Sequence, residues 1–232
     1  MLDYILNNPT VAYFLVIIAV IFSIYTSITV KTTYNRYEKV KTRTGVSGGN
    51  VARQILDSYG LYNVEVVLIQ RDKLTNFYDP RSNTVNLSPS VFYGDNVGAV
   101  GVAAHECGHA IQYAQNYFPI KLRNTLVPVV NFGSNAWFWF FILGMTFSLP
   151  ILVDVGIIFF ALIVVFQFAT LPVEFNASSR AMNVLSNQMI LGADEQKGAK
   201  RVLRAAAMTY LASLIVSIAQ LLRLLANTKR RR

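Results

Sequence analysis

Two histidines stand four residues apart in the segment 104–110, which reads Ala-His-Glu-Cys-Gly-His-Ala. Residues i and i+4 share one face of a helix, so His105 and His109 can bind one Zn²⁺ per chain through their ring nitrogens. Glu106 can then take a proton from a water held by the metal. The chain contains 2 histidines, and both lie in this motif. The spacing predicts a zinc hydrolase; the alternative is a chance pair on an ordinary helix.

A site with two histidines needs a third protein ligand and keeps one position for water. Glu174 is the strongest candidate, because we expect it to open a helix at the end of an apolar segment. The alternative is an ordinary carboxylate favoured there by the helix dipole. Asp194 and Glu195 are weaker candidates for the third ligand. Cys107 lies well round the helix from the histidine face, and we expect a small buried residue there rather than a thiolate ligand.

The composition is that of an integral membrane protein. Of 232 residues, 14% are charged and 53% belong to the hydrophobic group, and uncharged segments are long enough to cross a bilayer. The net charge of +9 comes from basic residues that flank these segments, without an aromatic-interleaved patch. This favours contact with the lipid bilayer and argues against nucleic acid as a partner. The single cysteine excludes an internal disulfide.

We therefore expect a mainly α membrane protein, with about four transmembrane helices and a small α+β zincin-like catalytic domain at the membrane surface. The expected crossings lie near 11–28, 127–147, 151–171 and 205–222. The expected parts are a transmembrane anchor (1–30), a soluble part with a hairpin and the histidine helix (31–126), a transmembrane hairpin (127–172), a helix region with the third ligand (173–204), and a last transmembrane helix with a basic tail (205–232).

The soluble part alternates short helices and strands. Apolar periodicity predicts a helix over 51–59 that ends at Gly60, then a strand over 64–70. A small antiparallel hairpin is expected from 76–79 and 84–88, and the histidine helix should begin at Asp95 or Asn96. Glycines weaken that helix, which we expect to be compensated by close approach of a neighbouring helix or of a substrate backbone. These glycines are Gly98, Gly101 and Gly108.

The second strand of this hairpin could serve as an edge strand to which an extended peptide adds, or it could simply cap a small sheet. Its residues are Thr84, Val85, Asn86, Leu87 and Ser88.

Topology is consistent with the metal site. Two crossings separate the histidine pair from Glu174, so both emerge on one side of the membrane. Basic residues concentrate on that side, which the positive-inside rule assigns to the cytoplasm, with both termini opposite. They are Lys31, Arg36, Lys39, Lys41, Arg43, Lys121, Arg123, Arg180, Lys197, Lys200, Arg201 and Arg204. The C-terminal Lys-Arg-Arg-Arg conflicts with this orientation, so the last segment could instead lie in the interface or re-enter.

Four blocks resemble, in order, the YugP-type family of bacterial membrane zinc metallopeptidases. They are Tyr-Asp-Pro-Arg at 78–81, His-Glu-Cys-Gly-His-Ala-Ile-Gln at 105–112, Val-Pro-Val-Val-Asn-Phe-Gly-Ser-Asn at 127–135, and Leu-Pro-Val-Glu-Phe-Asn-Ala-Ser at 171–178. The resemblance implies a multi-pass protease of the bacterial cell membrane, with His105, His109 and Glu174 as ligands and Glu106 as base. A more distant similarity to HtpX-type proteases implies quality control of membrane proteins, by analogy.

Several roles stay open. Many related zinc peptidases carry an Asp four residues after the glutamate ligand, where this chain has Ser178, so Asn176, Ser178 or a backbone carbonyl could orient the histidines. Tyr210 and Arg180 are the candidates for the oxyanion donor. We expect a peptide or membrane-protein substrate, and a regulatory membrane partner or a homo-oligomer is conceivable. The competing hypothesis is a non-catalytic zinc-binding membrane scaffold, which would have no need of Glu106.

Overall fold

The structure, a computed structural model, describes residues 1–229 of the chain. Its helices and strands follow one another in the order α1 (Leu2–Asn7), α2 (Pro9–Tyr37), α3 (Gly48–Ser58), β1 (Glu65–Leu68), β2 (Phe77–Asp79), β3 (Thr84–Leu87), α4 (Pro89–Phe92), α5 (Val97–Ala114), α6 (Phe118–Thr146), α7 (Pro150–Asn187) and α8 (Ala193–Lys229). Residues 230–232, which complete the basic tail, lie outside the described part, so the orientation of that tail stays a prediction.

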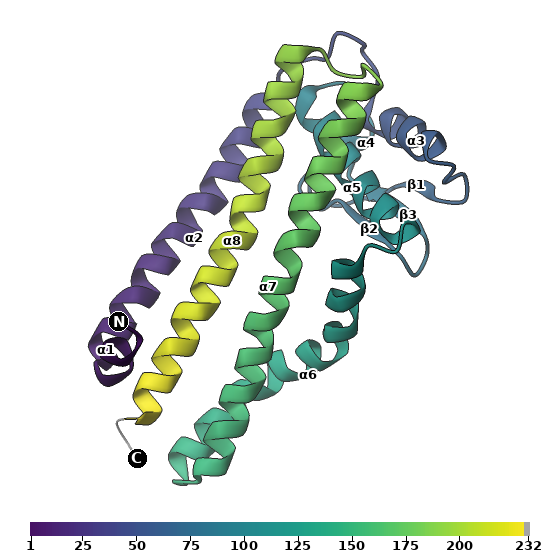
Figure 1. Cartoon of the computed structure of the whole chain (residues 1–232). Helices are drawn as coiled ribbons and strands as arrows, with labels where there is room; N and C mark the ends of the chain where they lie inside the picture. The colour runs from purple at the N-terminus through teal and green to yellow at the C-terminus, as the bar shows by residue number, and fades with distance from the viewer. Residues whose placement is uncertain (230–232) are drawn as a thin grey trace. The chain divides into compact units, whose positions relative to one another are not determined.

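Four of these helices are long and apolar enough to cross a membrane: α2, α6, α7 and α8. Figure 1 shows α7 and α8 as long uninterrupted ribbons. The prediction of a mainly α membrane protein with a small α+β part is confirmed. The chain forms two compact units: one holds Met1–Ser27, Lys121–Leu171 and the described part of Thr209–Arg232, and the other holds Ile28–Ile120 and Pro172–Met208. All residues of the candidate site except Tyr210 belong to the second unit.

The position of Glu174 within its helix differs from the prediction. We expected Glu174 to open a helix after Pro172, but α7 is continuous from Pro150 to Asn187. A proline inside a helix removes one hydrogen bond and crowds the preceding turn, which the packing of so long a helix can offset. Glu174 therefore lies far from any helix N-terminus, and the helix dipole cannot account for a carboxylate at this place.

The second unit is built on α3 and α5. Helix α3 buries Val51, Ala52, Ile55 and Leu56 on one face, and the Ser47 hydroxyl accepts a hydrogen bond from the Asn50 amide at its start. Helix α5 begins at the predicted cap: Asn96 Oδ1 accepts from the Ala99 amide at 2.9 Å. Both helices contribute to one apolar core with β3, α7 and α8. The helical pattern in the sequence is thus satisfied by burial of a single face.

The sheet excludes one of the two alternatives left open for residues 84–88, an edge strand that an extended peptide could join. The expected hairpin is present, with β2 antiparallel to β3, but β1 pairs with β3 in parallel, so the strand order is β1-β3-β2. β3 is therefore the central strand, and both of its edges are occupied. The segment from Thr84 to Leu87 cannot receive a substrate strand, because it is paired with β1 on one edge and with β2 on the other, and the Ser88 amide donates to Asn76 Oδ1. The outer strand on this side is β2.

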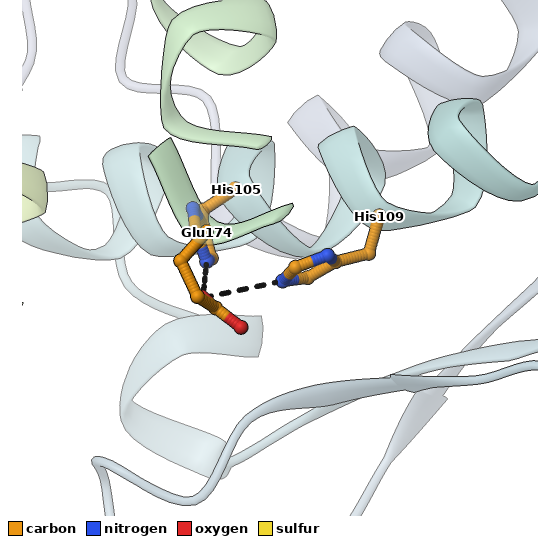
Figure 2. A group of neighbouring side chains, drawn as sticks. All are labelled: His105, His109 and Glu174. Carbon is orange, nitrogen blue, oxygen red and sulfur yellow. Dashed lines mark ion pairs between the residues drawn. The ribbon is translucent and has the colours of Figure 1, made fainter. Parts of the chain in front are cut away.

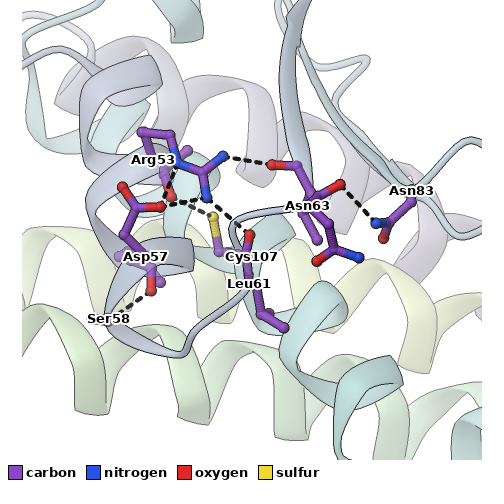
Figure 3. A network of polar contacts seen from close by, with 10 residues as sticks. Arg53, Asp57, Ser58, Leu61, Asn63, Asn83 and Cys107 are labelled. Carbon is purple, nitrogen blue, oxygen red and sulfur yellow. Dashed lines mark hydrogen bonds and ion pairs between the residues drawn. The ribbon is translucent and has the colours of Figure 1, made fainter.

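A polar network around Arg53 joins α3 to the loop that leads into β1 (Figure 3). The guanidinium donates to Asp57 Oδ1 and to the carbonyl oxygens of Leu61 and Val64 at 2.9, 2.9 and 2.6 Å.

Cys107 lies on the side of α5 that faces α3. Its Sγ donates to the Ala52 carbonyl at 3.5 Å, and the residue is fully buried. Burial raises the pKa of the Cys107 thiol. The prediction that Cys107 is a small buried residue is confirmed, and its sulfur points to α3.

Close contact between α5 and its neighbours explains the glycines of the histidine helix. A Cβ placed on Gly108 would lie 2.6 Å from the Ala177 carbonyl oxygen on α7, and one on Gly101 would lie 3.3 Å from Ala199 Cβ on α8. These helices therefore touch nearly backbone to backbone. The expected close approach of a neighbouring helix is confirmed for both positions.

Gly108→Ala should lower stability, because neither α5 nor the α7 backbone can move without disturbing the core. The expected loss in the free energy of unfolding is about 1–3 kcal/mol, the usual range for overpacking. Gly101→Ala is the matched control, because its new methyl group would lie 3.3 Å from its nearest neighbour, the Ala199 methyl group, whereas the one at position 108 would lie 2.6 Å from a backbone oxygen. Alanine also favours the helix by about 1 kcal/mol. Chemical denaturation of both variants would test this; equal stability of the two would contradict the proposed contact.

Candidate metal centre

Three side chains from two helices converge in the second unit: His105 and His109 from α5 and Glu174 from α7 (Figure 2). Glu174 Oε2 lies 3.3 Å from His105 Nε2 and 3.6 Å from His109 Nε2. The three potential ligand atoms all lie within 4.8 Å of one another. Tetrahedral zinc with bonds of about 2.0–2.1 Å places its ligand atoms roughly 3.4 Å apart. The cluster therefore needs only small adjustments to surround a metal ion.

One oxygen of this cluster lacks the partner that its burial demands. Glu174 is 4% exposed, and its Oε2 has no hydrogen-bond partner among residues 1–229, although two imidazoles face it. An unsatisfied buried acceptor costs on the order of 1–3 kcal/mol, and a charged one costs more. A cation between Oε2 and the two Nε2 atoms would remove this cost. The residues thus fit a zinc ion by donor type, by spacing and by the charge that the site lacks.

The opposite nitrogen of each imidazole is held by a polar side chain. His105 Nδ1 lies 3.2 Å from Ser178 Oγ, and His109 Nδ1 lies 3.1 Å from Gln112 Oε1. The Gln112 amide group donates to the Val173 carbonyl at 2.8 Å and to Asn176 Oδ1 at 3.0 Å, so its oxygen must face the imidazole. His109 Nδ1 therefore carries the proton, and Nε2 keeps the lone pair that a metal requires.

The contacts of Gln112 extend outward along α7. Asn176 Oδ1 also accepts from Arg180 Nε at 2.6 Å, and Arg180 Nη1 donates to Gln115 Oε1 at 2.5 Å. The Arg180 guanidinium lies over the Tyr117 ring at 5.8 Å from its centroid. This row of contacts joins the C-terminal end of α5 to an interior segment of α7 and keeps Gln112 in one orientation.

Gln112, which contacts His109, was not among the predicted partners of the histidines. Its side chain is fully buried, which is unusual for a glutamine. The available signal was its position three residues after His109, because residues i and i+3 are neighbours on a helix surface. A buried amide at that spacing is able to orient the imidazole.

Glu106 lies beside the cluster and is 7% exposed. Burial raises the pKa of the Glu106 carboxyl group. The electrostatic effect of His105 and His109 lowers this pKa and that of Glu174 raises it, and the net shift is upward. The backbone of Tyr78 in β2 also acts on this carboxyl group and lowers its pKa, but less than burial raises it. A carboxyl with a raised pKa is suited to accept a proton in one step and return it in a later one.

The protonation of His109 reflects the same carboxylate cluster. Burial lowers the pKa of the imidazole, but the Glu174 carboxylate outweighs burial and holds this pKa above its ordinary value. A proton and a metal ion therefore compete for the same nitrogen.

The remaining candidates have other contacts. The Glu195 carboxylate accepts from the backbone amides of Arg43 and Gly192 at 2.7 and 2.6 Å, and Asp194 pairs with Lys197 at 3.1 Å, so both serve the start of α8. Arg180 is engaged by Asn176 and Gln115. Tyr210 belongs to the first unit. The role of Arg180 or Tyr210 as an oxyanion donor stays a prediction.

A membrane protein with a two-histidine, one-glutamate cluster beside a buried glutamate has the parts of a membrane metallohydrolase. Comparison with known proteins defines the family: residues 12–229 match the family described as "Putative neutral zinc metallopeptidase", and the chain belongs to it. A protein of Bacillus subtilis (strain 168), described as "Putative membrane protease YugP", is 43% identical over 210 residues, covering 90% of this chain and 93% of the relative. No solved structure shows a significant match.

Gln112→Leu should weaken zinc binding by about 10–100-fold, the usual effect of removing the partner that orients a ligating histidine. Leucine fills a similar volume but accepts no hydrogen bond from Nδ1. Gln188→Leu is the matched control, because the Gln188 side chain donates to Ser58 Oγ at 2.6 Å, away from the cluster. Competition with a zinc-sensitive dye would measure both affinities; an unchanged affinity of the Gln112 variant would contradict the orienting role.

Proposed function

We propose that this chain is a zinc-dependent endopeptidase that cleaves peptide bonds at the cytoplasmic face of the membrane. The observation that carries the proposal is the buried, unsatisfied Oε2 of Glu174 facing the Nε2 atoms of both histidines. A structural zinc site normally closes its fourth position with protein. Here three protein ligands lie beside a fourth group, Glu106, that is suited to acid–base work. This favours catalysis over the non-catalytic scaffold.

In this mechanism His105, His109 and Glu174 would hold the zinc ion. Bound zinc supplies a Lewis acid that polarises the scissile carbonyl and lowers the pKa of a water molecule. Glu106 takes the proton of the attacking water and passes it to the leaving amine, a transfer that its raised pKa favours. Ser178 and Gln112 keep the histidines oriented toward the metal.

The substrate backbone is assigned to the outer edge of β2 in this proposal. One edge of β2 pairs with β3, and the Tyr78 backbone in β2 is near enough to Glu106 to lower the pKa of its carboxyl group. An extended peptide that adds to the outer edge would pass directly beside the proposed base. Binding through the main chain tolerates many sequences, which suits a protease acting on unfolded or damaged membrane proteins. The basic residues that flank the apolar segments support the cytoplasmic side.

Glu106→Gln should abolish cleavage while zinc stays bound. The amide cannot accept the proton, so turnover should fall by about two to four orders of magnitude. Glu65→Gln is the control, because Glu65 is exposed on β1. Cleavage of an unfolded membrane protein in detergent and zinc content by elemental analysis would be measured together. Retained cleavage in the Glu106 variant would refute the mechanism, and a loss of zinc would assign Glu106 to metal binding instead.

Glu174→Ala should remove the metal itself. Loss of one of three protein ligands should reduce zinc from about one ion per chain to a small fraction after dialysis at neutral pH. The circular dichroism spectrum should stay helical, since alanine suits the interior of α7. Zinc content equal to that of the unmodified chain would exclude Glu174 as a ligand.

A further inference from the structure

A groove with a volume of about 700 Å³ lies between α7 and α8 within the second unit. Its α8 wall carries Lys197, Lys200 and Arg204, and none of the residues that line it, all in the described part of the chain, is acidic. Lys197 pairs with Asp194, whereas neither Lys200 nor Arg204 forms an ion pair within residues 1–229. Two unpaired cations therefore stand one helical turn apart on one wall of a groove.

The two walls of the groove change character along their length. Ser179 and Asn183 on α7 line its middle and can donate hydrogen bonds. Phe175, which is 47% exposed, and the buried Ala207 line the end from which both helices continue as apolar segments. The groove is thus cationic and polar in its middle and apolar at one end.

This order of groups matches the depth profile of a lipid leaflet. Arg204 directly precedes the uncharged segment that begins at Ala205. Lys200 lies one turn earlier, about 6 Å along the helix axis. The headgroup layer on each side of a bilayer is roughly 5–7 Å thick. Lys200 and Arg204 therefore fall at the depth of the phosphates when the apolar segment of α8 fills the hydrocarbon region.

We propose that this groove binds one anionic phospholipid. Its phosphate lies between Lys200 and Arg204, its headgroup accepts hydrogen bonds from Ser179 and Asn183, and its glycerol and first methylenes contact Phe175 and Ala207. Basic pockets between membrane helices commonly hold anionic headgroups in this way. The apolar end favours a lipid over an acidic peptide, which has no need of it. The groove also includes Ser178, whose hydroxyl contacts His105 Nδ1, so the bound lipid borders the candidate metal centre.

The test is a lipid titration of the full chain in detergent, followed by native mass spectrometry. Phosphatidylglycerol should bind more tightly than phosphatidylcholine with matched acyl chains. Lys200→Gln/Arg204→Gln should reduce phosphatidylglycerol affinity by about thirtyfold, the contribution of two cations near an anionic lipid. Lys31→Gln/Lys39→Gln is the matched control: it removes the same charge from two exposed residues outside the groove and should leave the affinity nearly unchanged.

Four results would overturn the proposal. One is equal affinity of the groove variant and the unmodified chain for phosphatidylglycerol. Another is an equal loss in the control variant, which would reveal general attraction to basic residues. The third is full displacement of the lipid by an acidic peptide of glutamates and glycines, which would make the groove a peptide site. Inorganic phosphate, included as a competitor, should displace the lipid only weakly, because it lacks the apolar contacts; displacement at equal concentration would assign the site to free phosphate. None of these readouts depends on zinc or on peptidase activity.

Discussion

The second unit depends on one constraint: the Glu174 carboxylate is buried opposite two imidazoles, and its Oε2 has no hydrogen-bond donor among the described residues. A buried charge is tolerated only when it is paired or coordinates a metal. Residues around Glu174 hold the two imidazoles opposite its carboxylate. Gly108 lets α5 approach the Ala177 backbone, and Ser178 and Gln112 hold the outer nitrogens of the imidazoles. The contact between α5 and α7 therefore both packs the second unit and brings the three candidate ligands together.

Local patterns in the sequence predicted what local physics determines. The i and i+4 spacing placed His105 and His109 on one face, and the Asn96 cap defined where their helix begins. The apolar segments predicted the membrane-spanning helices, and the turn residues predicted the β2–β3 hairpin. Each of these features depends on residues within a few turns of one another. Glu174 was predicted as the third ligand from the membrane topology, because an even number of crossings returns the chain to the side of the membrane that holds the histidines.

The features that the sequence did not reveal depend on contacts between distant segments. Pro172 suggested a helix boundary, but α7 continues through it. The packing of the long helix therefore outweighs the local tendency of proline to end a helix. The pairing of β1 with β3 joins strands separated by the whole of β2, which no turn signal can predict. In the sequence Gln112 cannot be told from an ordinary polar residue, because its role depends on hydrogen bonds to three partners on α5 and α7. A pattern within one element cannot show which polar side chain another element will bury.

The neutral partners of the histidines follow from the charge balance of a buried site. A divalent cation at the cluster would be balanced by Glu174 and by Glu106 in its ionised form, which leaves no net charge. A carboxylate in place of Gln112 or Ser178 would add a third negative charge to a region where Glu106 and Glu174 are both nearly inaccessible to solvent. Uncompensated charge in such a region is costly. Amide and hydroxyl partners orient the imidazoles without that cost, and in the proposed mechanism they leave Glu106 as the group whose charge changes. Ser178, in place of the aspartate of many related zinc peptidases, is thus consistent with the acid–base role that we propose for Glu106.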